Sequence, residues 1–338
     1  MPPSALPLLL YRQVIVCVTV SVFFCFAAAC LPGCVTVKVS LWEEPGPLQE
    51  KVISGYGPDK ILLLDISGLL LEQAPATWLG VGKQVSLPAR LKEELQKAAA
   101  DRRLKALVVR LHSPGGTVAA ADLIYHELQQ FKQQHRLPLV VSVLGLAASG
   151  GYYLAQAADV IVAQPTSLIG SIGVIALKFN LKVLLNRFGV ETELVKTGRL
   201  KDLWSPFRPA TAEEARIMQA LLDDFHRRFV AVVAAGRNFD PATAQRLGDG
   251  RLFTATQALD LNLVDQLGYL DDAFNRAKEL AGIETARIIM YHTADSYRGN
   301  VYATPMPQQG LGVLPDPVSP TLALPQFYYL WWPHHPAH

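Results

Sequence analysis

Short apolar runs alternate with amphipathic segments through the middle of this chain. Buried strands are predicted where aliphatic and β-branched residues cluster, over residues 61–66, 106–111, 139–144, 160–163 and 172–177. Helices are predicted where the apolar positions follow a helical period, over residues 89–100, 117–133 and 152–158. Strands that alternate with helices in this way predict an α/β architecture with buried strands.

A longer helix is predicted to begin after Thr211. The sequence Thr211-Ala212-Glu213-Glu214 has the pattern of a capping box, in which the first and fourth residues satisfy each other's backbone N–H groups. The apolar stripe that follows repeats every four residues, at Ile217, Leu221, Phe225, Phe229 and Val233. This stripe predicts a face that packs in the core or against another subunit.

The first 34 residues have the pattern of a targeting or anchoring segment. Arg12 precedes an apolar run over residues 13–30, about as long as the shortest membrane spans. Residues 31–34 (LPGC) resemble the bacterial lipoprotein processing site, which makes Cys34 a candidate for lipidation. An uncleaved signal anchor is the alternative. Either anchor would hold the rest of the chain on one face of a membrane, and we expect the extracytoplasmic face.

The remaining chain divides by composition. Residues 35–59 are predicted to be a spacer, residues 60–292 one large α/β domain, and residues 293–338 a Pro-rich, aromatic tail. The tail includes QFYYLWW at 326–332, a segment suited either to a subunit contact or to a membrane interface. Nothing in the sequence selects between these two roles.

Composition and charge exclude several functions. Half of the 338 residues are hydrophobic, so the chain can bury a large core, and its net charge is only +2. Since no basic stripe with interleaved aromatic residues is present, we expect no nucleic-acid partner. All four cysteines lie in the first 34 residues, and no H-E-x-x-H motif occurs. The large domain is therefore predicted to use neither disulfides nor a thiol nucleophile, and no metal or other cofactor is predicted.

Residues 147–153 (AASGGYY) place a serine between small residues where a strand should turn into a helix. Backbone N–H groups in the first turn of a helix lack internal partners, so Gly150 N–H can stabilise negative charge on an attacked carbonyl oxygen. Ser149 is therefore a candidate nucleophile. Taken alone, the four residues ASGG are equally compatible with a tight turn that has no chemical role.

A serine nucleophile needs a base, and Lys201 is the better candidate. No histidine lies between Ser149 and His226, and His226 stands beside two arginines on a helix face predicted to be solvated. Lys201 lies in a loop bounded by glycine and proline with apolar neighbours, where it could be desolvated. Lowering a lysine pKa from about 10.4 to 7 or 8 takes about 4 kcal/mol of differential solvation. Taken alone, a loop lysine is more often a surface charge.

Four motifs together resemble the signal peptide peptidase A family of membrane-associated serine peptidases, which use a Ser/Lys dyad. They occur in the family's order, at 111–116 (LHSPGG), 147–153 (AASGGYY), 169–174 (IGSIGV) and 198–206 (GRLKDLWSP). The resemblance runs from about Lys60 to Ala281, and the 52-residue separation of Ser149 from Lys201 is similar to that of the family's short members. It implies a ClpP/crotonase-like superfold of repeated ββα units.

The resemblance implies a role for each matching residue. Ser149 would be the nucleophile and Lys201 the general base, with Ser171 orienting the lysine amine. Gly116 and Gly150 would supply the N–H donors of the oxyanion hole. Two positions depart from the family pattern, with His112 in place of Asn and Ile169 in place of Thr. His112 leaves open how the glycine loop is anchored, but it does not change the glycines. Neither departure involves a reacting atom.

The family's substrates imply an endopeptidase that degrades cleaved signal peptides or other unfolded apolar peptides at a membrane. The family's short members are similar in forming rings, so we expect a homo-oligomer in which a neighbouring subunit can supply the lysine. A ClpP-class protease acting on specific membrane partners is an alternative that the sequence leaves open. Two further alternatives are an acyl-CoA enzyme of the crotonase superfold, which would not need the lysine, and an inactive scaffold, which would not need the dyad.

Overall fold

The computed structural model of the chain describes residues 46–73, 85–293, 300–302 and 327–331. The chain divides into two units, Met1–Trp42 and Glu43–His338, and the first lies outside the described residues. The predicted anchor at 1–34, with Cys34, therefore also lies outside them. Among the helices that the structure describes, none has the length and apolar character needed to cross a membrane.

The described elements follow the predicted alternation of strands and helices. The strands are β1 (Gln49–Gly55), β2 (Lys60–Ser67), β3 (Leu104–Ser113), β4 (Gly115–Thr117), β5 (Leu139–Ala148), β6 (Val160–Ala163), β7 (Leu168–Gly170), β8 (Ile175–Ala176), β9 (Leu252–Thr254), β10 (Gln266–Leu267), β11 (Arg287–His292) and β12 (Phe327–Leu330). The helices are α2 (Leu87–Ala99), α3 (Val118–His135), α4 (Gly150–Ala155), α5 (Lys182–Arg187), α6 (Ala212–Arg237), α7 (Pro241–Leu247), α8 (Ala255–Asp260) and α9 (Leu270–Ala281).

The central sheet is mostly parallel. Its strands follow the order β1-β11-β2-β3-β5-β6-β10, and β7 pairs with the end of β5 and with β9. The pairs β2–β3, β3–β5 and β5–β6 are parallel, whereas β1 and β9 join their neighbours in antiparallel fashion. Parallel strands are covered on both faces, which explains why β2 and β3 are apolar runs rather than alternating ones.

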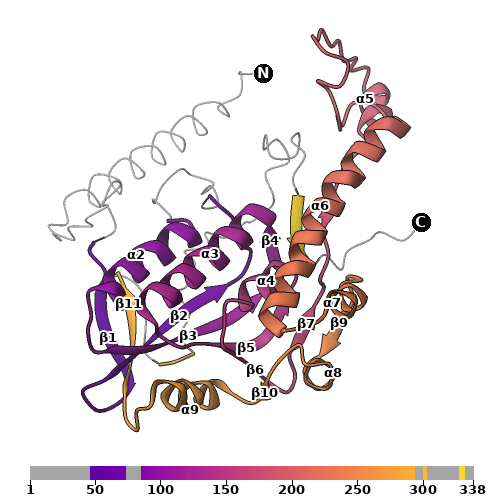
Figure 1. Cartoon of the computed structure of the whole chain (residues 1–338). Helices are drawn as coiled ribbons and strands as arrows, with labels where there is room; N and C mark the ends of the chain where they lie inside the picture. Colours follow the sequence, from indigo (N-terminus) through magenta and orange to yellow (C-terminus); the bar gives the residue numbers. More distant parts are fainter. Residues whose placement is uncertain (1–45, 74–84, 294–299, 303–326, 332–338) are drawn as a thin grey trace, which may run out of the picture. The chain divides into compact units, whose positions relative to one another are not determined.

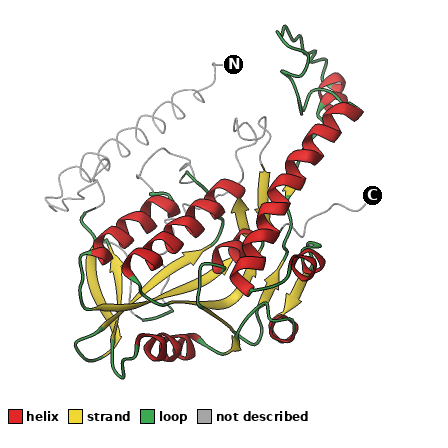
Figure 2. Cartoon of the chain, viewed as in Figure 1, coloured by secondary structure: helices red, strands yellow, loops and turns green. Residues whose placement is uncertain are grey.

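Helices cover both faces of this sheet. Figures 1 and 2 show α2 and α3 side by side on one face and α9 on the other. A large core on the first face joins residues of β2, β3 and β5 to α2, α3, α4 and α6, and a smaller one joins the opposite face to α9. The turn at the end of β5 is therefore positioned by elements that pack tightly in the larger core.

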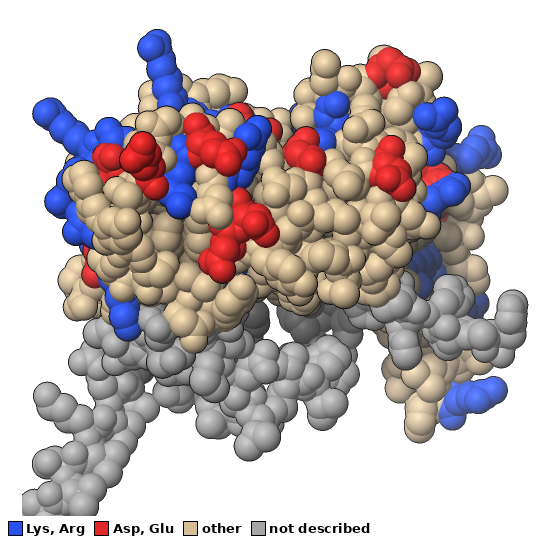
Figure 3. Space-filling view, turned by 90° about the horizontal axis from the view of Figure 1, so that it is seen from below, with Lys and Arg blue, Asp and Glu red and all other residues tan. Residues whose placement is uncertain are grey.

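Charges in the sheet are paired. The Arg110 and Asp65 side chains are both buried and lie 2.7 Å apart, and Lys60 reaches Glu50 at 2.7 Å and Asp101 at 2.6 Å. Buried charges cost much less when they are paired and hydrogen-bonded. On the face shown in Figure 3 the exposed acidic and basic side chains are interspersed rather than gathered by sign.

A small second sheet contains residues 327–330 of the tail. Strand β12 lies between β4 and β8 and is antiparallel to both. Figure 1 draws β12 in yellow beside β4. The sequence predicts either a subunit contact or a membrane interface for this tail. In the structure its described strand instead lies on the chain's own β4 and β8.

Several boundaries differ from the sequence predictions. Strand β1 lies within the stretch predicted as a spacer and pairs with β11, so the sheet begins ahead of residue 60. The strand predicted over 172–177 is reduced to β8, because Gly170 and Ser171 both have positive φ and turn the chain after β7. Strand β5 is four residues longer than predicted and ends directly before Ser149.

The capping box predicted for the long helix is present. The Thr211 hydroxyl accepts a hydrogen bond from Glu214 N–H at 3.2 Å, and the Glu214 carboxylate accepts one from Thr211 N–H at 2.8 Å. Of the predicted stripe, Phe229 and Val233 are buried, whereas Leu221 is 38% exposed. The second half of α6 therefore packs in the core, and its first half extends beyond it.

Candidate functional site

Ser149 lies at the strand-to-helix turn predicted for it, between β5 and α4. Its backbone has φ 52° and ψ −119°, a region that residues other than glycine rarely occupy. Two hydrogen bonds hold this conformation, from Ser149 N–H to Gly170 O at 2.7 Å and from Tyr153 N–H to Ser149 O at 2.8 Å. Strained turns of this kind are typical of functional positions.

The backbone of the glycine loop lies directly against the backbone that follows Ser149. A Cβ placed on Gly115 would lie 2.8 Å from Gly150 N and would overlap the carbonyl oxygen of Tyr329. Gly115 also has a φ of +98°, which L side chains rarely adopt. A Cβ on Gly116 would overlap the carbonyl oxygen of Leu70. Both glycines are needed because backbone approaches backbone here.

Strand β12 lies along this loop. The position between β4 and β8 that it fills is called the β12 groove. Tyr329 is paired with Gly116 and Leu330 with Gly115, and Trp331 N–H donates to Pro114 O at 2.8 Å. On its other edge, Phe327 is paired with Ala176 of β8. An extended peptide is therefore held between the glycine loop and the segment that follows Ser171, with the Tyr329 carbonyl beside Gly115 and Gly150.

The Tyr329 side chain fills an aromatic pocket. Its ring is buried, with ring centroids 5.1 Å from Tyr153 and 4.7 Å from Phe229, and its hydroxyl donates to Phe225 O at 2.7 Å. Burial raises the pKa of the Tyr329 phenol, so it stays a neutral hydrogen-bond donor at physiological pH. The pocket accepts a large apolar ring with a polar tip.

A second hydrogen-bond network positions the pocket wall. The Tyr153 hydroxyl donates to Asp122 at 2.5 Å, and the Arg228 guanidinium contacts the same carboxylate oxygen from α6. Burial, followed by the bond to Asp122, raises the pKa of Tyr153. The network ties α3, α4 and α6 together around the side chain of the bound strand.

Ser171 lies close to Ser149. Gly170, its neighbour in sequence, accepts the Ser149 N–H bond and is paired with Ala148 in the β5–β7 register. Ser171 itself has a φ of 50°, and its N–H donates to Arg251 O at 2.8 Å. The structure thus brings four predicted site residues to one place, namely Ser149, Ser171, Gly116 and Gly150.

Lys201 lies in the loop between α5 and α6 and is exposed in the single chain. The loop is held by a charge cluster, in which Arg208 contacts Asp202 at 2.7 Å and Glu214 at 2.9 Å. The hydrogen bond from Arg208 lowers the pKa of Asp202 and lowers that of Glu214 to about 2. Both carboxylates are therefore ionised at neutral pH, and the loop has a defined conformation around an exposed lysine.

Within one chain the structure does not join Lys201 to Ser149. Glu214 holds the lysine loop at the start of α6, whereas Phe229, further along α6, packs on Tyr153, one turn beyond Ser149. The stretch of α6 between Glu214 and Phe229 is about 22 Å long. The desolvation expected for Lys201 is therefore absent in the single chain.

His226, the rival base, has a structural contact, because a ring nitrogen lies 2.7 Å from Gly248 O. The aromatic pocket and its occupant are not predicted by the sequence. Tyr153 belongs to a predicted motif, but the composition of the tail gives it no link to the domain. The signal was present in the unusual density of aromatic residues at 326–332, but no local pattern identifies their partner.

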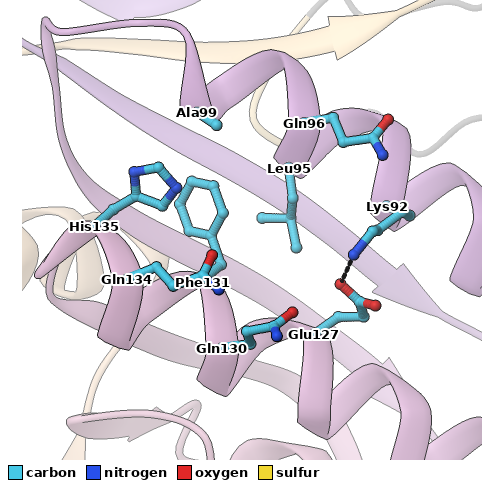
Figure 4. Close-up of a pocket in the computed structure, with 9 residues that line it drawn as sticks. All are labelled: Lys92, Leu95, Gln96, Ala99, Glu127, Gln130, Phe131, Gln134 and His135. Carbon is cyan, nitrogen blue, oxygen red and sulfur yellow. Dashed lines mark hydrogen bonds and ion pairs between the residues drawn. The ribbon is translucent and has the colours of Figure 1, made fainter.

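A hollow of about 110 Å³ between α2 and α3 lies apart from these residues. Figure 4 shows Leu95, Phe131 and His135 at one end of it and the Lys92–Glu127 ion pair, at 2.7 Å, at the other. Its lining residues all come from the two helices, and they include neither serine nor cysteine. The candidate chemistry is therefore at the β12 groove and not in this hollow.

Gly115→Ala is expected to lower peptide hydrolysis at least tenfold while leaving the helical content unchanged. The new Cβ has to displace the peptide carbonyl or the Gly150 amide, and losing one well-placed oxyanion donor costs more than tenfold in kcat. The measurement is kcat/KM on an apolar peptide together with circular dichroism. Gly282→Ala is the control, because Gly282 also has a positive φ, ends α9 and has open space around it. An active Gly115→Ala protein would argue against this placement of the substrate carbonyl.

Comparison with known proteins identifies the family. Residues 131–284 match the profile of Peptidase family S49, and residues 80–169 match that of Clp protease. The second match, together with the mostly parallel sheet, confirms the ClpP/crotonase-like α/β fold.

Individual relatives give the same result. A putative signal peptide peptidase SppA of Enterococcus faecium is 32% identical over 75% of each chain. A putative protease of Synechocystis sp. is 41% identical over 57% of this chain and 69% of its own length. Protease 4 of Salmonella typhi is 34% identical over 67% of this chain but only 37% of its own length.

Proposed function

This chain belongs to the S49, or signal peptide peptidase A, family of serine peptidases, and we propose that it cleaves extended apolar peptides with a Ser149/Lys201 dyad shared between two copies. The observation that carries the proposal is the peptide strand β12 beside Ser149. It is antiparallel to β4 and β8, and its Tyr329 carbonyl borders Gly115 and Gly150. A substrate strand in the same position would present its carbonyl carbon to the serine.

The proposed reaction begins with attack of Ser149 Oγ on that carbonyl carbon. Lys201, as a neutral amine, takes the serine proton, while the N–H groups of Gly116 and Gly150 stabilise the oxyanion. The lysine then protonates the leaving amine, which gives an acyl-enzyme on Ser149. The lysine then takes a proton from a water molecule that attacks this ester, and it returns that proton to Ser149 Oγ as the acyl group leaves. Ser171, next to Gly170, is proposed to accept a hydrogen bond from the lysine and to orient it.

The position of Lys201 supports its delivery by a neighbouring subunit. The lysine loop and Ser149 are associated with opposite ends of a long stretch of α6, so each chain offers a serine at one place and a lysine at another. A contact in which one copy's loop covers the next copy's serine repeats head to tail, and such a contact forms a ring when the rotation between copies closes. Burial in that contact would supply the desolvation that Lys201 lacks in the single chain.

The surface around α5 supports the same assembly. None of the α5 residues is buried, and the exposed apolar residues around the lysine loop are Leu177, Phe179, Val183, Leu184, Phe188, Val190, Leu194, Val195 and Phe207. Apolar surface gathered in one short segment is typical of protein interfaces. We propose that this surface contacts a second copy of the chain.

The proposed substrates are cleaved signal peptides or other unfolded apolar peptides. The groove binds an extended backbone, and its pocket accepts a large ring, so folded proteins are excluded by conformation. We propose that the segment before residue 35 holds this site at a membrane, on the extracytoplasmic side, where such peptides are released. That segment lies outside the described residues.

Labelling of the serine tests the chemistry directly. A fluorophosphonate should modify the intact protein at Ser149, and peptide mapping by mass spectrometry should locate the adduct there. Ser149→Ala should abolish labelling. Ser167→Ala is the matched control, because Ser167 is also buried and its hydroxyl hydrogen-bonds to Val143 O at 3.2 Å. Labelling elsewhere, or labelling that persists in Ser149→Ala, would contradict the assignment of the nucleophile.

A further inference from the structure

The segment Gly68–Glu72 lies along the edge of β4 opposite β12. Leu70 N–H donates to Gly115 O, and Thr117 N–H donates to Leu70 O, both at 2.9 Å. The close approach at Gly116 makes this pairing possible, because any Cβ there would overlap Leu70 O. Strand β4 therefore has the Leu70 segment on one edge and β12 on the other. The segment brings an acidic residue, Glu72, to the rim of the groove.

The Glu72 carboxylate is held in place by the residue that caps α3. The Thr117 hydroxyl donates a hydrogen bond to Glu72 Oε2 at 2.7 Å. Its oxygen, Thr117 Oγ1, also accepts a hydrogen bond from Ala120 N–H at 3.2 Å. With one bond given and one accepted, the hydroxyl has a single orientation. The exposed Glu72 side chain therefore has one hydrogen bond, which holds its carboxylate beside Thr117.

Thr117 is also the residue opposite Tyr328 in the β4–β12 register. Directly opposed residues of an antiparallel pair project to the same face of the sheet. Tyr328 and Glu72 therefore flank Thr117 on one face, while the neighbouring Tyr329 projects to the other face, into the aromatic pocket. Burial and the Glu72 carboxylate raise the pKa of the Tyr328 phenol, as expected for a group close to a negative charge.

We propose that Glu72 selects a cationic side chain, Lys or Arg, at the substrate position that Tyr328 occupies in this structure. The inference rests on the proposed function, since it takes β12 as the guide to how a substrate lies. The selected residue is the one immediately before the residue whose carbonyl faces Gly115 and Gly150. The enzyme would then prefer a basic residue followed by a large apolar one. An exposed ion pair of this kind predicts a preference of about two- to fivefold.

The test uses the full-length protein and three peptides with Tyr before the cleaved bond. The peptides differ only in the residue before that Tyr, which is Lys, Met or Glu; Met is similar in length to Lys but uncharged. The ratio of kcat/KM for the Lys peptide to that for the Met peptide should be about two to five, with the Glu peptide below both. Sodium chloride at about 0.5 M should bring the ratio towards one, because it screens exposed charges.

Two variants identify the responsible carboxylate. Glu72→Gln keeps an oxygen for the Thr117 hydroxyl and should reduce the Lys-to-Met ratio to about one, whereas Glu72→Lys should favour the Glu peptide. Glu127→Gln is the control, because Glu127 is a paired carboxylate on α3 that faces the α2–α3 hollow, and it should leave the ratio unchanged. A ratio of one in the wild type, or a preference that survives Glu72→Gln, would overturn the inference.

Binding to the Ser149→Ala protein separates this inference from the proposed function. If the wild type cleaves none of the three peptides, the proposed function fails, and fluorescence anisotropy with labelled peptides still measures their relative Kd. Tighter binding of the Lys peptide that is lost in Ser149→Ala/Glu72→Gln supports the Glu72 subsite. Equal binding of the Lys and Met peptides, or no binding of either, overturns it.

Discussion

Lys201→Ala is expected to lower kcat for apolar peptides by about 10²–10⁴-fold, the usual contribution of a general base. Ser149→Ala is expected to cost at least as much, since it removes the attacking atom. The double variant should be little worse than either single one, because residues that act as a unit are not additive. Steady-state kinetics on the purified full-length proteins measure all three effects. Lys92→Ala is the matched control, because Lys92 is also an exposed lysine but lies on α2, where it pairs with Glu127.

Mixing the two single variants tests whether the dyad is shared between subunits. If each site takes Ser149 from one chain and Lys201 from the next, random 1:1 assembly leaves about a quarter of the sites intact. Refolding or co-expressing the variants together should therefore restore about that fraction of activity. A mixture of Ser149→Ala with the double variant should stay inactive. No recovery from the first mixture, or a near-normal rate for Lys201→Ala alone, would refute the shared dyad.

Tyr329→Ala is expected to raise kcat/KM for added peptides, because the tail and a substrate strand compete for β4 and β8. Losing a buried aromatic ring typically costs about 3–5 kcal/mol, and here the loss would weaken docking of the tail by about 10²–10⁴-fold. If the docked tail limits access to the groove, kcat/KM should increase by up to the factor by which docking is weakened. Progress curves with a fluorogenic peptide measure the effect.

The control for the tail is Tyr302→Ala, because Tyr302 is 55% exposed. It should leave kcat/KM unchanged, and both variants should keep the thermal transition of the remaining domain. An unchanged kcat/KM in Tyr329→Ala would mean that the tail leaves the groove readily without the substitution. A fall in kcat/KM would mean that Tyr329 helps to build the site rather than to occupy it.

Local sequence patterns were sufficient for the elements that position Ser149. The apolar run before it and the glycines after it predicted a strand-to-helix turn, and Thr211 with Glu214 predicted where α6 begins. These features depend on neighbours within a few residues, whose hydrogen bonds and periodicity can be read directly. Three of the four motifs then identified residues that gather around Ser149, because they follow the order of a known family, whereas the motif that contains Lys201 lies apart from it in the single chain.

The partners of the tail could not be predicted in the same way. Tyr329 is paired with Gly116, which is 213 positions away, and no local propensity encodes a pairing at that distance. The strand predicted over 172–177 failed for a related reason. Its apolar composition favours a strand, but Gly170 and Ser171 adopt positive φ to form the turn beside Ser149. The geometry around Ser149 overrides the propensity of the segment that follows it.

The placement of β12 between β4 and β8 also bears on solubility. When the tail leaves, both neighbours become open sheet edges, with rows of backbone N–H and C=O groups that lack partners. Open edges are templates for any extended chain, including the same strand of another molecule, and so they promote edge-to-edge aggregation. The aromatic strand thus covers two edges that would otherwise be open, and a chain shortened before Phe327 is expected to precipitate more readily on storage.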